Sequence, residues 1–79
     1  MDPIIIRPFM GLSGEYSVIL VSNSGQMQSI EVIAKDEFDA VMLAIEETKW
    51  NAHGLITVDT QETIEKGLEP VLEFEYEPI

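Results

Sequence analysis

The chain contains no cysteine and only one histidine, His53, among its 79 residues. Without cysteine it forms neither disulfide bonds nor thiolate metal sites, as is typical of proteins from a reducing compartment. A chain of this length lies near the lower limit for a core that stabilises itself. Its hydrophobic fraction of 46% is that of a globular chain rather than a disordered one. We therefore expect a single folded domain over residues 1–79.

Long hydrophobic runs and a basic leader are also missing. The apolar stretch at the N-terminus ends at Arg7 and Pro8, so it is too short to span a membrane. It also lacks the basic start of a secretory signal. These absences predict a cytoplasmic protein that does not associate with membranes.

Positive charge is scarce. Fifteen Asp and Glu residues stand against four Lys and Arg residues, which gives a formal net charge of −11. Such a charge repels nucleic acids and anionic lipids, and it attracts basic protein surfaces from a distance. Direct binding to DNA or RNA is thus the function that this composition most strongly opposes.

Patterns that indicate catalysis or cofactor binding are absent as well. His53 has no serine in a nucleophile-elbow pattern to act on, so we expect a capping or surface histidine. The glycine-containing stretches "GLSG" and "SNSGQ" lack the glycine spacing and the lysine of phosphate-binding loops. Asp59, Glu62 and Glu65 would bind calcium only adventitiously, since no EF-hand loop is present. The sequence therefore predicts no enzyme, no cofactor and no dedicated metal site.

The clearest structural pattern is a β-hairpin. The β-rich runs at residues 15–21 and 27–34 are separated by "SNSGQ", in which Gly25 suits a tight turn with a positive φ. Alternation predicts that one face carries the larger apolar side chains, namely Tyr16, Val18, Leu20, Ile30 and Val32. Ile19 and Val21 add apolar surface to the second face, which otherwise carries polar residues.

The period then changes from strand to helix. Asp36 is a suitable N-cap, and we expect a helix over residues 37–50 that stops before Gly54, which can supply a left-handed cap. The helical spacing predicts an apolar face made of Phe38, Val41, Met42 and Ile45. Phe38 is expected in the core. For Trp50 we favour a core position over an exposed anchor.

Three further segments complete the predicted sheet. Residues 3–10 are expected to form an edge strand because Pro8 cannot donate to a sheet ladder. Residues 55–58 and 70–78 are expected to be strands. Two interpretations fit residues 59–67: a short helix or turn capped by Asp59 or Thr60 and ended by Gly67, which we favour, or an exposed strand.

These elements predict an α+β fold. It consists of a small antiparallel sheet of four to five strands with one main helix packed on one face, in the order β-β-β-α-β-β.

Acidic residues are concentrated in the last 21 residues. Within "LEFEYEP", glutamates alternate with apolar residues and so lie on one face of a strand, about 6.7 Å apart. That spacing is of the same order as the charge spacing of a nucleic-acid backbone, where each strand of a duplex carries one charge per ~3.4 Å of axis along a longer, wound path. Glutamates on an edge strand also serve solubility and protect against aggregation. The candidate partner-binding residues are Asp59, Glu62, Glu65, Glu69, Glu73, Glu75 and Glu77.

The chain resembles the small phage-encoded inhibitors that include type I anti-CRISPR proteins and other DNA mimics. The resemblance covers most of the chain in architecture and charge: a hairpin ("EYSVILVSNSGQMQSIEVIA"), a helix ("DEFDAVMLAIEETKW"), a further strand and a strongly acidic composition. It includes no diagnostic motif. It implies binding to the basic nucleic-acid channel of a host effector such as a CRISPR complex, in the cytoplasm of the host cell, with target DNA blocked.

Two functional hypotheses follow. The first is an acidic inhibitor that occupies a basic nucleic-acid-binding site on another protein, through the C-terminal acidic residues. The alternative is a small assembly or regulatory module, monomeric or homodimeric, that acts through an apolar or edge-strand interface. Trp50, Phe9 or the segment at residues 3–9 would carry that interface.

Overall fold

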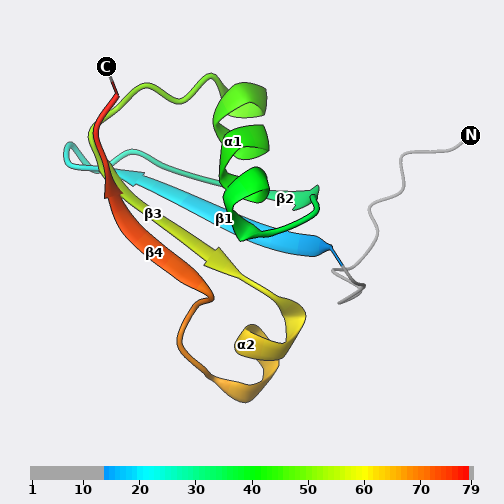
Figure 1. The fold of residues 1–79 in the computed structure, drawn as a ribbon. Helices are drawn as coiled ribbons and strands as arrows, with labels where there is room; N and C mark the ends of the chain where they lie inside the picture. The colour runs from blue at the N-terminus through cyan, green and yellow to red at the C-terminus, as the bar shows by residue number, and fades with distance from the viewer. Residues whose placement is uncertain (1–13, 79) are drawn as a thin grey trace, which may run out of the picture.

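The computed structural model describes residues 14–78, which form a four-stranded antiparallel sheet with helices (Figure 1). This confirms the predicted α+β class. In chain order the elements are β1 (Glu15–Ser22), β2 (Met27–Ile33), α1 (Glu37–Thr48), β3 (Gly54–Asp59), α2 (Gln61–Lys66) and β4 (Leu72–Tyr76). The strands lie in the order β2-β1-β3-β4 across the sheet, so the two central strands are β1 and β3. The strand predicted at residues 3–10 lies outside the described residues.

The predicted hairpin is confirmed as β1 and β2. Tyr16 lies opposite Val32 and Val18 opposite Ile30, so the apolar residues share one face as the alternation predicts. Gly25 in the turn has a φ of 99°, a conformation that glycine adopts without steric cost. Its N–H donates to the carbonyl of Ser22 over 3.0 Å and closes the turn.

Helix α1 begins where the sequence predicts and ends earlier. The Asp39 N–H donates to the carboxylate of Asp36 over 2.8 Å, so Asp36 is the N-cap. At the other end, Lys49 adopts the left-handed conformation and its N–H donates to the carbonyl of Ile45. The predicted end at residue 50 with Gly54 as the cap is therefore wrong, because a lysine supplies the cap and Gly54 begins β3.

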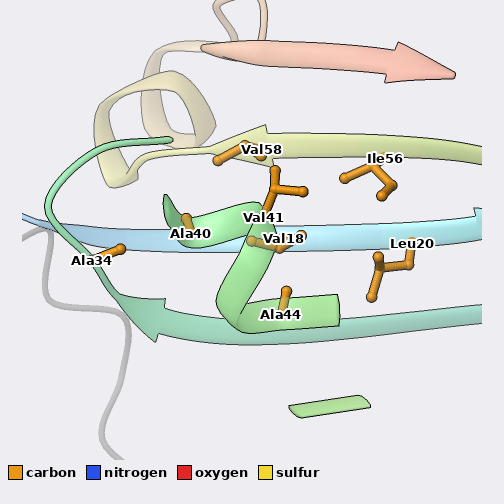
Figure 2. Close-up of a cluster of buried hydrophobic side chains, with 8 residues drawn as sticks. All are labelled: Val18, Leu20, Ala34, Ala40, Val41, Ala44, Ile56 and Val58. Carbon is orange, nitrogen blue, oxygen red and sulfur yellow. The ribbon is translucent and has the colours of Figure 1, made fainter. Parts of the chain in front are cut away.

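The core lies between α1 and the central strands (Figure 2). Four strand residues, Val18 and Leu20 of β1 with Ile56 and Val58 of β3, are fully buried. On the helix the buried residues are Ala40, Val41 and Ala44. Small alanine side chains let the helix backbone approach the sheet closely, so the helix turns its alanine face toward the strands.

The apolar face predicted for α1 is therefore partly wrong. Val41 is buried and Ile45 packs against the core, but Phe38 is 61% exposed and Met42 is 69% exposed. Phe38 is not a core residue. The prediction counted large side chains at helical spacing, whereas contact with the sheet is made by the side of the helix that carries two alanines.

Residues 59–67 contain a short helix, α2, as favoured from the sequence. Thr60 is the N-cap of α2, and it forms a capping box with Thr63: the Thr63 N–H donates to the Thr60 hydroxyl, and the Thr60 N–H donates to the Thr63 hydroxyl. Gly67 ends the helix with a φ of 65°. The helix lies past the end of β3, away from α1 (Figure 1).

Candidate functional site

Strand β4 is the last strand on its side of the sheet and carries the acidic row. In the described part of the chain it pairs only with β3. Its side chains alternate as predicted. Leu72, Phe74 and Tyr76 are half-buried and pack against the core, whereas the glutamates at 73, 75 and 77 are exposed. The core contacts on one face thus hold the carboxylates on the other.

The register with β3 determines the neighbours of these glutamates. Glu73 lies opposite Thr57, whose hydroxyl donates to the Glu73 carboxylate over 3.3 Å. Glu75 lies opposite Leu55, an apolar neighbour that offers its carboxylate no hydrogen bond. No lysine or arginine occurs on β3 or β4. The glutamate row is therefore presented without neutralising charges on either strand.

The other predicted acidic residues precede β4 in and around α2. Glu62 forms an ion pair with Lys66 over 3.3 Å, and the Glu65 carboxylate accepts a hydrogen bond from Gln61. Glu69, in the loop that leads to β4, is exposed. Both residues of the ion pair are more than half exposed, so the pair stabilises the protein weakly and leaves Glu62 accessible.

Asp59 differs from the other six acidic residues. Its side chain is half-buried and accepts a hydrogen bond from the Thr63 hydroxyl over 2.7 Å, which ties the end of β3 to α2. This carboxylate has a structural contact within the chain. The other six candidate residues are exposed and form two groups, which we call the β4 row (Glu73, Glu75 and Glu77) and the α2 group (Glu62, Glu65 and Glu69).

The two acidic groups follow one another along the chain. Helix α2 lies at the end of the sheet where β4 begins, and a short loop joins the two elements (Figure 1). Between residues 59 and 78 the only basic residue is Lys66. This stretch of the chain therefore carries seven acidic residues and one basic residue.

An apolar row lies beside the β4 row, on the face of the sheet opposite α1. Register places Met27, Val21 and Leu55 next to one another across β2, β1 and β3, and the row ends at Glu75. Met27 is 71% exposed and Leu55 39% exposed. Val21 was predicted on this face, whereas the other two were not. The sequence did contain a sign of this apolar row: Leu55 and Ile56 are consecutive apolar residues of a strand, so one of them must lie on the face opposite the core.

Trp50 follows α1 and packs against the core, as favoured from the sequence. Its indole Nε1 is buried and makes no hydrogen bond to the described residues. A cavity of about 440 Å³ lies beside it. The lining contains no Asp, Glu, His or Ser and consists of Gln26, Met27, Gln28, Thr48, Lys49, Trp50, Asn51 and Ala52. The cavity thus offers no carboxylate or imidazole for acid–base chemistry.

A cluster suited to metal binding is missing from the described residues. Within residues 14–78, no three His, Asp or Glu side chains are placed to hold a metal ion together. His53 is exposed, as a surface histidine, and its backbone carbonyl accepts a hydrogen bond from Asn23. None of the helices in the described part of the chain has the length and apolar character needed to cross a membrane.

Comparisons with protein-family models, curated proteins and solved structures found no match to this chain.

Proposed function

We propose that this protein is an acidic inhibitor that occupies the basic nucleic-acid-binding site of a host effector protein and blocks the binding of target DNA, in the manner of anti-CRISPR proteins and other DNA mimics. The observation that carries the proposal is the β4 row, an exposed line of glutamates on and directly after β4. Among the described residues this strand pairs only with β3, and neither strand contains a lysine or arginine.

The row is suited to replace phosphates because of its spacing and rigidity. Alternate side chains of a strand lie about 6.7 Å apart. The backbone of β4 is held by its ladder with β3, and Leu72 and Phe74 pack against the core. The backbone that carries the glutamates is thus preorganised, so the conformational entropy lost on binding comes mainly from the side chains that form the contacts.

The net charge of −11 supports the same function at longer range. A strongly negative protein is steered toward a positively charged channel, which accelerates association at low ionic strength. The same field keeps the protein away from nucleic acid itself. Its target is therefore the protein that binds DNA rather than the DNA.

The test is displacement of DNA from purified nucleic-acid-binding effectors, with guide-loaded CRISPR complexes included. A labelled target duplex is bound to the effector, and its release is followed by fluorescence anisotropy as this protein is added. The variant carries Glu73→Lys, Glu75→Lys and Glu77→Lys. We expect it to displace DNA at least roughly tenfold less well than the unaltered protein, because each reversal turns an attraction into a repulsion.

A matched control separates the row from the overall charge. Glu31, Glu46 and Glu47 are exposed residues of β2 and α1, and reversing them changes the net charge by the same amount. We expect this control to lose much less inhibition. Equal losses in the two triple variants would show that only total charge matters, and unchanged inhibition in the β4 variant would remove the row from the mechanism.

The apolar row favours a second candidate function, an assembly module that forms a homodimer. Apolar residues at the centre of an exposed face are typical of interfaces. Light scattering at high salt tests this function. A dimer that persists when charges are screened and dissociates on Leu55→Lys would support it, whereas a monomer at all concentrations would exclude it.

A further inference from the structure

We infer that the outer edge of β4 is a docking site for an extended partner segment in which basic and apolar residues alternate, added to the sheet as a fifth strand. The inference rests on the proposed function for the basic character of the partner, and it specifies how that partner is held.

The edge itself supplies backbone hydrogen-bonding groups. Among the described residues β4 has a neighbour on one side only, so every second N–H and C=O along Leu72–Tyr76 points away from the sheet. Such an edge pairs readily with another extended chain. Backbone pairing would add directional contacts to the electrostatic attraction of the glutamates.

In the part of the chain that the structure describes, no helix packs mainly over β4, which leaves its helix side open to an added strand. Helix α1 packs mainly over β2, β1 and β3, and Leu72, Phe74 and Tyr76 remain half-buried beyond it. Val41 of α1 lies beside Val58 of β3 (Figure 2). Phe38, three residues earlier on the same flank of the helix, is 61% exposed. Apolar side chains of a fifth strand would therefore have apolar neighbours on this side.

Alternation in β4 determines the partner's pattern. Residues directly opposite each other in an antiparallel pair share a face and lie about 4.5 to 5.5 Å apart at their Cβ atoms. Basic residues of the partner would lie opposite Glu73 and Glu75, and apolar residues would lie opposite Leu72, Phe74 and Tyr76. A segment with a uniform charge or a helical period cannot place basic residues beside the glutamates on one face of β4 and apolar residues beside the core side chains on the other.

The same pattern excludes a second copy of this chain from the edge. Antiparallel pairing of β4 with itself, centred on Phe74, would place Glu73 opposite Glu75 of the other copy. Like charges directly opposite one another destabilise a strand pair. Inward and edge charges are a known means of preventing self-association through sheet edges. The edge therefore selects a basic strand over its own.

The test uses the full chain and three synthetic peptides with capped ends. The first peptide alternates lysine and valine over seven residues. The second has the same sequence with N-methyl groups on all internal residues, so it keeps the charge and loses the backbone donors. The third has the same composition in two blocks, four lysines followed by three valines. Binding is followed by the ¹H–¹⁵N spectrum and by hydrogen exchange of the β4 amides.

We expect the alternating peptide to shift the β4 amide resonances and to slow exchange of those β4 amides that do not pair with β3. The N-methylated and block peptides should bind at least roughly tenfold more weakly than the alternating peptide. The first lacks the backbone hydrogen bonds of a strand, and the second lacks its two-faced pattern. If all three bind equally well, or if none binds, docking at the edge is wrong.

These outcomes separate the inference from the proposed function. Equal binding of the three peptides, lost in the Glu73→Lys, Glu75→Lys, Glu77→Lys variant, would leave charge-based inhibition intact while overturning the edge mode. Failure of the protein to displace DNA from any effector would instead overturn the proposed function, even with the alternating peptide docked on β4.

Discussion

Gly54 occupies a position in β3 where no side chain fits. A Cβ atom there would lie 1.8 Å from the carbonyl oxygen of Val21 and 2.7 Å from the Cα of Ser22, both backbone atoms of β1. Gly54→Ala would force the two central strands apart. We expect a loss of about 3 kcal/mol in the free energy of unfolding, at the upper end of overpacking costs. Urea unfolding followed by circular dichroism measures this loss.

Gly67 is the matched control for that substitution. It has a φ of 65°, but a Cβ atom at this position would meet no heavy atom within 4 Å. Gly67→Ala incurs only the cost of a left-handed residue, about 1 to 2 kcal/mol. Equal losses for the two variants would mean that the close approach of β1 and β3 at Gly54 does not limit stability.

Helix α1 is the element in which sequence and structure differ most, and two substitutions test its orientation. Phe38 is 61% exposed, so Phe38→Ala should cost less than about 1 kcal/mol, as for other surface changes. Ala44 is fully buried against the sheet, so Ala44→Leu should cost about 1 to 3 kcal/mol by overpacking. Thermal and urea unfolding give both values. A large loss for Phe38→Ala with a small loss for Ala44→Leu would contradict this orientation of the helix.

Other elements were predictable from their local patterns. The hairpin follows from two alternating runs around a glycine turn, and the cap at Asp36 follows from a polar residue before a helical period. The orientation of α1 was not predictable in this way, because periodicity weighs large side chains. The helix packs on the sheet through the face that allows the closest approach of helix to sheet, and this is the face that carries the small side chains of Ala40 and Ala44.

For the whole molecule, the excess negative charge opposes folding. The described acidic residues crowd onto one small domain with few basic neighbours, so their mutual repulsion falls as salt screens it. We expect the melting temperature to rise by several degrees as sodium chloride increases from about 0.01 M to about 1 M, over which the Debye length falls from about 30 Å to about 3 Å.

The β4 row should contribute to this salt effect. Replacing Glu73, Glu75 and Glu77 together with glutamine removes three negative charges and keeps the side-chain size. The triple variant should melt higher at low salt and show a smaller rise with salt than the unaltered protein. A melting temperature that is flat or falls with added salt in the unaltered chain would show that charge repulsion is negligible in the folded state.

The sequence by itself determined the features that depend on local geometry. A strand turns successive side chains to opposite faces, so "LEFEYEP" had to separate its glutamates from Leu72, Phe74 and Tyr76 wherever it lay. Composition alone likewise determined the net charge and the absence of thiol chemistry.

Only the tertiary structure decided what surrounds that strand. The pairing of residues 54–58 with 72–76 makes β4 the last strand on its side of the sheet within residues 14–78, gives Glu73 its contact with Thr57 and brings the apolar row up to Glu75. These relations join residues far apart in the chain, and strand order depends on which pairings together bury the core, which no local pattern encodes.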